Sequence, residues 1–125
     1  MKAPASLFLL AANAKERYGS IMFTLDELAE TIAQRADADA KLSYTRSLLD
    51  KGAAYCARKF AEEAIELTIA AVAEDESAVR AEAADVLYHL LVVLRARGVP
   101  FASVMSELEG RTRQSGHEER ASRKA

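Results

Sequence analysis

The chain has 125 residues, which suits a single domain, and it carries a formal net charge of −2. Half of the residues are apolar and 29% are charged, as in a soluble globular protein. This balance gives no electrostatic reason to expect a nucleic-acid partner, and no apolar run approaches the ~20 residues of a membrane span. We therefore expect no nucleic-acid and no membrane partner. The single cysteine, Cys56, cannot form an internal disulfide, which suits a reducing compartment.

Residues 1–22 differ from the rest of the chain. Their apolar run, Ala5 to Ala12, is at the short limit for the core of a signal peptide. We interpret residues 1–22 as an N-terminal extension outside the domain, with Met22 as an alternative start.

The first strong helix signal is a capping box. Thr24 is followed three residues later by Glu27, and the apolar pattern that follows predicts a helix ending near Arg35. The hydroxyl of Ser43 then favours the start of a short helix, which should stop at Gly52.

Two long helices follow. The pattern predicts one from about Ala53 to Ala73 and a second over residues 78–97, with Ser77 as the N-cap of the second. Pro100 begins a last helix, and residues 110–125 form a polar tail that we expect to be mobile. The domain thus covers residues 23–109. Two long apolar helices give one chain a thin core, so we predict an all-α helix bundle completed by homodimerisation.

The second long helix holds an unusual pair of charges. Between Ala81 and Leu94 only Glu82 and Asp85 are formally charged, and apolar residues otherwise surround the helix axis. Such a helix should be largely buried, with Leu87 and Leu90 in its core stripe. A buried carboxylate costs several kcal/mol unless it is compensated, so something must stabilise Asp85.

The spacing of the acidic residues suggests a cation. Glu63 and Glu66 share one helix face, and so do Glu82 and Asp85. Two antiparallel helices can direct all four carboxylates to one point, where they cannot all be ionised without cations. Oxygen ligands suit Mg²⁺ or Mn²⁺, whereas zinc would need Cys or His and only His89 is nearby. The alternative is a solvated face whose acids pair with basic neighbours, namely Arg58, Lys59 and Arg80.

Several sequence blocks together resemble the MazG-like all-α NTP pyrophosphatase superfamily, and within it the phosphoribosyl-ATP pyrophosphatase family. The blocks are S-Y-T, L-L-D-K-G, R-K-F-A-E-E-A-I-E and E-A-A-D-V-L-Y-H-L-L-V, at residues 43–45, 48–52, 58–66 and 82–92. The resemblance covers about residues 23–108. Ala61 departs from it, because the family pattern has glycine before the paired glutamates.

The resemblance implies a function, namely the hydrolysis of phosphoribosyl-ATP to phosphoribosyl-AMP and pyrophosphate in histidine biosynthesis. It also implies a cytoplasmic homodimer that uses Mg²⁺. By matching position, the metal ligands would be Glu63, Glu66, Glu82 and Asp85.

Further candidate site residues lie in the same sequence blocks. Glu62 is our candidate for activating water, with a surface glutamate as the alternative. Lys51 and Lys59 are candidates for phosphate contact, or else exposed lysines. The candidates for binding phosphate or ribose are Ser43, Tyr44 and Thr45, which could instead simply cap a helix.

His89 lies one turn beyond Asp85. It is either a partner of a metal ligand or a core histidine with satisfied hydrogen bonds, and we favour the core histidine. Two rival functions remain open at this point. One is a house-cleaning NTP or dNTP pyrophosphatase of the same superfamily, and the other is a non-catalytic helical dimerisation module.

Overall fold

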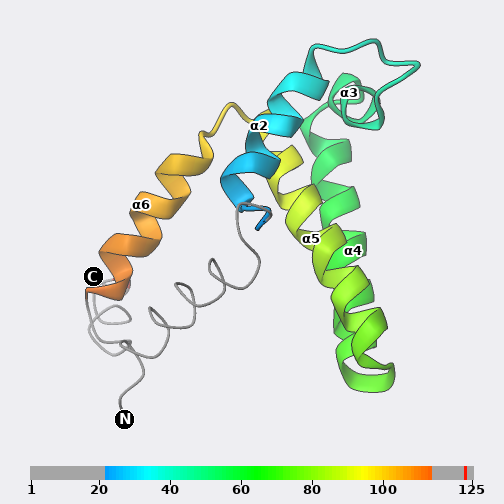
Figure 1. Cartoon of the computed structure of the whole chain (residues 1–125), viewed down its shortest axis with the longest axis vertical. Coiled ribbons are helices and arrows are strands. Elements are labelled where there is room, and N and C mark those ends of the chain that lie inside the picture. Colours follow the sequence, from blue (N-terminus) through cyan, green and yellow to red (C-terminus); the bar gives the residue numbers. More distant parts are fainter. Residues whose placement is uncertain (1–21, 114–122, 124–125) are drawn as a thin grey trace.

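The computed structural model describes residues 22–113 and Arg123, and all regular structure in this part of the chain is helical. Figure 1 shows the arrangement, and its labels are used from here on. The helices are α2 (Leu25–Ala36), α3 (Tyr44–Asp50), α4 (Ala53–Ala73), α5 (Glu76–Ala96) and α6 (Phe101–Thr112). The predicted all-α class is confirmed. None of these helices is long and apolar enough to cross a membrane.

The helix starts follow the polar side chains that the sequence places before them. The Thr24–Glu27 capping box forms as predicted, and the hydroxyl of Ser43 accepts a hydrogen bond from the Arg46 amide at 3.1 Å. Gly52 joins α3 to α4 with a φ of 94°, a left-handed conformation that glycine adopts without strain. The last helix continues through Thr112, past the Gly110 at which we placed the start of the tail.

Helices α4 and α5 form an antiparallel hairpin (Figure 1) with a two-residue connection, Glu74 and Asp75. The predicted N-cap, Ser77, is wrong. Asp75 caps α5 instead, because its carboxylate accepts a hydrogen bond from the Ala78 amide at 2.9 Å and Ser77 is already helical. A carboxylate at this position also interacts favourably with the positive end of the helix dipole.

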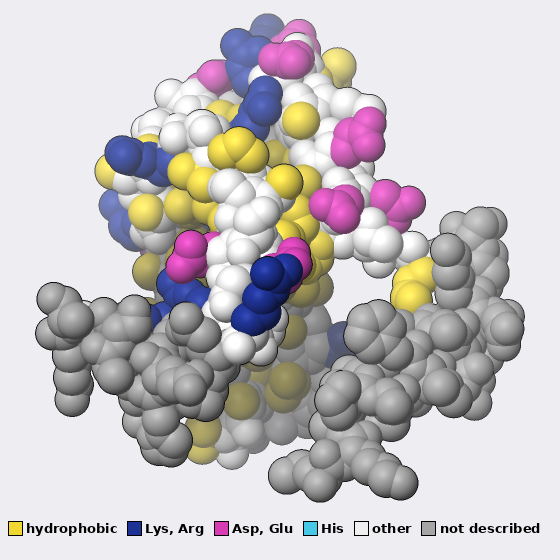
Figure 2. Space-filling view, turned by 90° about the vertical axis from the view of Figure 1, so that its left-hand side faces the viewer, with side chains coloured by type: hydrophobic (Ala, Val, Ile, Leu, Met, Phe, Trp, Pro, Cys, Tyr) yellow, Lys and Arg dark blue, Asp and Glu magenta, His cyan; other side chains and the backbone are white. Residues whose placement is uncertain are grey.

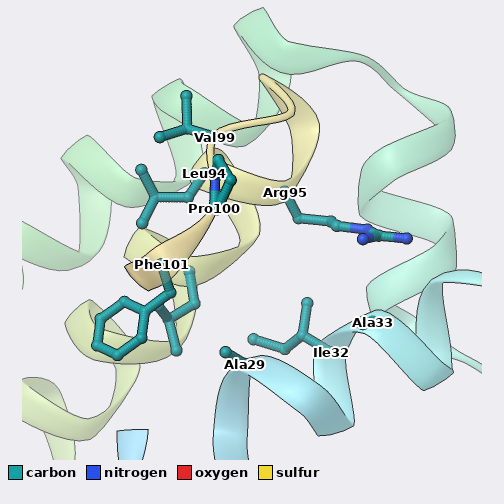
Figure 3. Close-up of a pocket in the computed structure, with 9 residues that line it drawn as sticks. Ala29, Ile32, Ala33, Leu94, Arg95, Val99, Pro100 and Phe101 are labelled. Atoms are coloured by element: carbon teal, nitrogen blue, oxygen red, sulfur yellow. The ribbon is translucent and has the colours of Figure 1, made fainter. Parts of the chain in front are cut away.

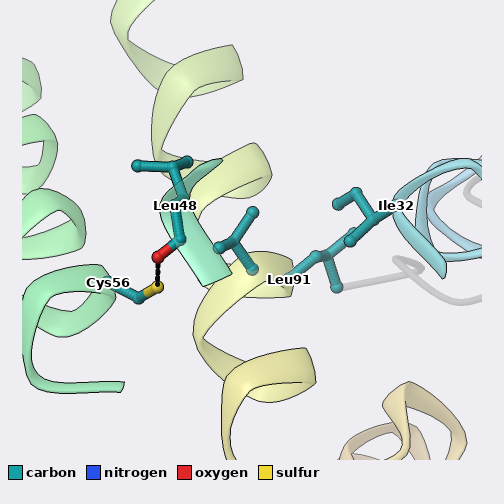
Figure 4. Close-up of a cluster of buried hydrophobic side chains, with 5 residues drawn as sticks. Ile32, Leu48, Cys56 and Leu91 are labelled. Atoms are coloured by element: carbon teal, nitrogen blue, oxygen red, sulfur yellow. Dashed lines mark hydrogen bonds between the residues drawn. The ribbon is translucent and has the colours of Figure 1, made fainter. Parts of the chain in front are cut away.

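Helices α2 and α3 cover the end of the hairpin away from the tight turn (Figure 1). The core lies there and combines residues of all four helices, with Ile32, Leu48, Cys56 and Leu91 facing one another (Figure 4). The Cys56 thiol donates a hydrogen bond to the Leu48 carbonyl at 3.2 Å, and burial raises its pKa. Cys56 is therefore a buried core residue with little thiolate character.

Much apolar surface remains open in the single chain. Leu87 is 41% exposed although we assigned it to the core. Only one side of α5 is buried, and its main buried apolar residues are Leu91 and Val92. The expectation that α5 is largely buried is therefore wrong for one chain. Hydrophobic side chains also collect on the face that α6 crosses, as the space-filling view shows (Figure 2). Beyond Phe101, which packs on the core, α6 leaves Met105 and Leu108 nearly half exposed.

A small apolar cleft lies between α2 and the junction of α5 with α6 (Figure 3). It has a volume of about 110 Å³, and Ile32 faces Leu94 and Phe101 across it. Its lining is almost entirely aliphatic, with Arg95 at its edge.

Candidate active site

Three of the four predicted carboxylates converge between α4 and α5. Glu63 and Glu66 come from α4 and Glu82 from α5, and one oxygen of each lies within 4.8 Å of the others. The i,i+3 spacing on α4 and the tight antiparallel turn produce this arrangement. We refer to Glu63, Glu66 and Glu82 as the glutamate cluster.

The environment of the glutamate cluster disfavours its own negative charge. Burial and the neighbouring Glu66 raise the pKa of both Glu63 and Glu82, and Asp85 adds to both effects. In addition, the Oε2 atom of Glu82 is buried and has no hydrogen-bond partner within the described part of the chain. An unpartnered carboxylate oxygen among acidic neighbours needs a cation or a proton. The donor set is all oxygen, so the residues fit a hard divalent ion such as Mg²⁺ or Mn²⁺.

Asp85 differs from the prediction. It lies near enough to contribute to the raised pKa of Glu63 and Glu82, but its side chain is exposed and it does not belong to the glutamate cluster. In the single chain this position of α5 is open to solvent. The burial argument for Asp85 is therefore wrong here, and its role as a ligand stays a prediction.

His89 is buried beside the glutamate cluster. Its Nε2 atom lies 4.0 Å from Oε1 of Glu63, and its Nδ1 atom has no hydrogen-bond partner among the described residues. Burial and the charge of Lys59 lower the pKa of His89 and outweigh the opposing effect of Asp85 and Glu62, so the imidazole is neutral at pH 7. It is not the satisfied core histidine that we favoured. Its position agrees with the alternative, a partner of a metal ligand.

Glu62 and Lys59 form an ion pair at the edge of the same site. Nζ of Lys59 donates to Oε2 of Glu62 at 3.1 Å, and this bond raises the pKa of Lys59. Glu62 is exposed on α4 directly before Glu63, whereas the Lys59 side chain is largely covered. Glu62 is thus a carboxylate next to the glutamate cluster but not part of it, and the ammonium group of Lys59 lies beside it.

The residues of the S-Y-T block have separate roles. The Ser43 hydroxyl donates to the Arg35 carbonyl at 2.9 Å and also caps α3, while the Thr45 hydroxyl lies 2.6 Å from the Tyr88 hydroxyl. Both side chains are buried and fully engaged within the protein. Only Tyr44 is open to a ligand, since its ring is 58% exposed. For Ser43 the simple-cap alternative describes the structure well.

Lys51 lies farther along the chain, after α3. Its Nζ donates to the Tyr55 hydroxyl at 3.4 Å and lies 4.6 Å from the centre of the Tyr55 ring. Arg58 approaches the same ring at 5.1 Å. No described contact joins Lys51 to the glutamate cluster, so its phosphate contact remains a prediction.

Sequence reasoning missed two residues near the site. Tyr88 stacks on Tyr44, with ring centres 6.4 Å apart, and meets the His89 ring edge-on at 5.1 Å. Arg35 and Tyr88 help to line a groove beside this aromatic group. Nothing in their spacing marks either residue, because the groove forms only when α2, α3 and α5 come together.

Comparison with known proteins identifies the family. A sequence model of the phosphoribosyl-ATP pyrophosphohydrolase family matches residues 25–112, which include every helix described above. The chain belongs to this family. A phosphoribosyl-ATP pyrophosphatase of Azorhizobium caulinodans is 59% identical over 100 residues, covering 80% of this chain and 92% of the relative. Phosphoribosyl-ATP pyrophosphatase 1 of Bradyrhizobium diazoefficiens is 57% identical over 102 residues, covering 82% and 96%.

A third relative, the phosphoribosyl-ATP pyrophosphatase of Paracoccus denitrificans, is 54% identical over 100 residues and covers 80% of this chain and 93% of the relative. The family predicted from the sequence blocks is confirmed, and with it the assignment to the hydrolases.

Proposed function

We propose that this chain hydrolyses phosphoribosyl-ATP to phosphoribosyl-AMP and pyrophosphate, the second step of histidine biosynthesis, with Mg²⁺ at the glutamate cluster. The observation that carries the proposal is the convergence of Glu63, Glu66 and Glu82 in a chain whose family and relatives carry this activity in their names. Asp85, one turn beyond Glu82, is the proposed fourth ligand.

Bound at this site, a divalent ion would neutralise triphosphate charge and stabilise the charge that develops on the leaving pyrophosphate. The glutamate cluster and Asp85 hold it, and their mutual repulsion favours its binding. His89 limits the freedom of Glu63 from the buried side, because its ring is fixed by Tyr88 and Tyr44.

Glu62 is the proposed base that removes a proton from the attacking water. Its carboxylate is exposed to solvent and forms an ion pair with Lys59. Lys59 is then also within reach of a phosphate oxygen at the same position. Tyr44 supplies an exposed aromatic surface, while Ser43 and Thr45 hold it in place. Lys51 is a proposed phosphate contact at the outer end of α3.

We further propose that the working form is a cytoplasmic homodimer. The exposed apolar residues of α4 and α6 support this, because a 12-residue helix such as α6 is marginal without packing.

The first experiment is pyrophosphate release from phosphoribosyl-ATP by the full chain, with Mg²⁺ and with EDTA. We expect turnover that requires the metal. Turnover of free dNTPs or NTPs without turnover of phosphoribosyl-ATP would instead support the house-cleaning enzyme. If no nucleotide is hydrolysed and divalent ions do not stabilise the fold, the structural module is the correct function.

A pair of variants tests the ligand assignment. Asp85→Asn should abolish Mg²⁺-dependent turnover while the chain stays folded, because the amide supplies no charge to the ion. Glu30→Gln, which removes an exposed carboxylate of α2 far from the cluster in sequence, should keep wild-type turnover. Full activity of Asp85→Asn would remove Asp85 from the metal site.

A further inference from the structure

The groove beside the aromatic group lies across the Tyr44 and Tyr88 rings from the glutamate cluster. It has a volume of about 500 Å³ and is formed where the end of α2, the start of α3 and the middle of α5 meet. Its lining residues are Arg35, Ala38, Leu42, Ser43, Tyr44, Thr45 and Tyr88. Two partly buried hydrogen bonds fix its walls, one from Ser43 to the Arg35 carbonyl and one between Thr45 and Tyr88.

Arg35 is the cation of this groove. Its guanidinium forms no ion pair and no hydrogen bond with any residue in the described part of the chain, and it is exposed. Among the described residues, neither acid of the α2–α3 loop forms an ion pair with it. Asp37 and Asp39 contribute to the raised pKa of Arg46, which is due mainly to the hydrogen bond between Arg46 and Asp50. Arg35 is thus available to an anionic ligand.

A continuous series of contacts leads from this groove to the glutamate cluster. Tyr44 and Tyr88 line the groove and stack on each other, and both rings meet His89 edge-on. His89 in turn lies 4.0 Å from Glu63. The two aromatic rings therefore separate a carboxylate site, which suits a metal-bound polyphosphate, from a groove lined by Arg35.

The substrate of the proposed function has two charged ends as well. The adenine of phosphoribosyl-ATP carries the triphosphate-bearing ribose on one side and a ribosyl 5′-phosphate on the other. We propose that the groove binds this second phosphate, with Arg35 contacting it and Tyr44 supporting the adenine between the two ends. This inference rests on the proposed function. It makes Arg35 a specificity-determining residue, because ATP and dNTPs lack the group that it contacts.

The test compares two ligands that differ only in the ribosyl phosphate arm. The affinities of phosphoribosyl-AMP and of AMP for the full chain are measured by calorimetry in EDTA, so that the metal plays no part. We expect the wild-type chain to bind phosphoribosyl-AMP more tightly. Arg35→Gln should weaken the binding of phosphoribosyl-AMP by about 10- to 100-fold, as for the loss of a charged hydrogen-bond pair, and leave AMP unchanged.

The control is Arg97→Gln. Arg97 is also an exposed arginine at the end of a helix, but it lies outside the groove, so it should alter neither affinity. In turnover, Arg35→Gln should raise KM for phosphoribosyl-ATP and largely keep kcat, because the contact is distant from the reacting phosphates.

Equal weakening of both ligands, or no weakening of either, in a folded Arg35→Gln chain would overturn the inference. That result leaves the proposed function intact when the wild-type chain still shows Mg²⁺-dependent turnover of phosphoribosyl-ATP. Absence of that turnover contradicts the proposed function itself, whatever the two affinities are.

Discussion

At the residue scale, the features of the glutamate cluster that favour the binding of a cation also lower the stability of the metal-free chain. Glu63 and Glu82 have raised pKa values because burial and neighbouring carboxylates disfavour their charged forms. Those same features make the site attractive to a divalent cation. The metal-free chain should therefore be less stable at neutral pH than its packing alone would allow.

The raised pKa values determine the pH dependence of the metal-free chain. In the unfolded chain both glutamates titrate near the ordinary value of 4.5, and in the folded chain they titrate higher. Between these values the folded state binds more protons than the unfolded state. The free energy of unfolding should therefore fall as pH rises through this window, and recover on acidification toward 4.5. Urea unfolding in EDTA at several pH values would measure this free energy. A free energy of unfolding that rises with pH in this window would contradict the raised pKa values of Glu63 and Glu82.

Replacing one glutamate tests both effects together. Glu82→Gln should raise Tm in EDTA at pH 7, because it removes a repelled charge, and should reduce the increase in Tm that Mg²⁺ causes. For the wild-type chain, Mg²⁺ at about 100 times its Kd should add about 2.7 kcal/mol. Scanning calorimetry with and without Mg²⁺ measures both changes. A Glu82→Gln chain that is less stable in EDTA and gains as much from Mg²⁺ as the wild type would show that Glu82 is not a ligand.

The residues of the candidate site differ in how well the sequence predicts them. The i,i+3 spacing of Glu63 and Glu66 on α4 and the short turn to Glu82 on α5 predicted the convergence of these three residues, because both signals are local. The unpartnered His89 and the groove at Arg35 depend on how α2 and α3 lie against α5. Such contacts between distant segments leave no periodic signal in the sequence.

At the scale of elements, the short α4–α5 connection matters most. It has two residues, so any shift in where α5 begins would rotate Glu82 relative to Glu63. The sequence predicted all five described helices, because capping residues and apolar periods are local signals. It misplaced the start of α5, since Asp75 and Ser77 are both good N-caps and sequence alone does not choose between them.

The cap assignment makes a direct prediction. Asp75→Ala should lower the free energy of unfolding by about 1 kcal/mol, because the Ala78 amide loses its partner. Ser77→Ala is the matched control and should change stability little, because Ser77 lies inside the first turn of α5. Both changes can be read from urea unfolding in EDTA. A larger loss in Ser77→Ala than in Asp75→Ala would restore the original prediction.

At the scale of the whole molecule, one chain does not cover its own apolar surface. On α4, Ile65 is 61% exposed and Ile69 is 54% exposed, and they lie one turn apart on the same side. The sequence predicted a thin core and a need for a partner. The sequence did not predict which faces of α5 would be covered within one chain, because the apolar residues of α5 lie all around the helix axis.

The homodimer can be tested on this face. Ile69→Lys should raise the dimer dissociation constant at least about tenfold, because a large aliphatic side chain is lost from an apolar contact and a charge takes its place. Lysine is preferable to an acidic replacement here, because it adds no negative charge near the carboxylates of α4. Ala40→Lys, in the exposed α2–α3 loop, introduces the same charge as a control. Sedimentation of both variants across a concentration series measures the dissociation constants. An unchanged dimer in Ile69→Lys would show that this face of α4 is not the dimer interface.

The two-residue connection between α4 and α5 has a further consequence for the rate of folding. All the proposed metal ligands belong to one helical hairpin, whose contacts are close in sequence and so form early. Closing the hairpin brings the glutamates of α4 against Glu82, and their repulsion opposes this early step. Refolding should therefore be faster in Mg²⁺ or in mild acid than in EDTA at neutral pH, so the ion would act during folding as well as in the finished site.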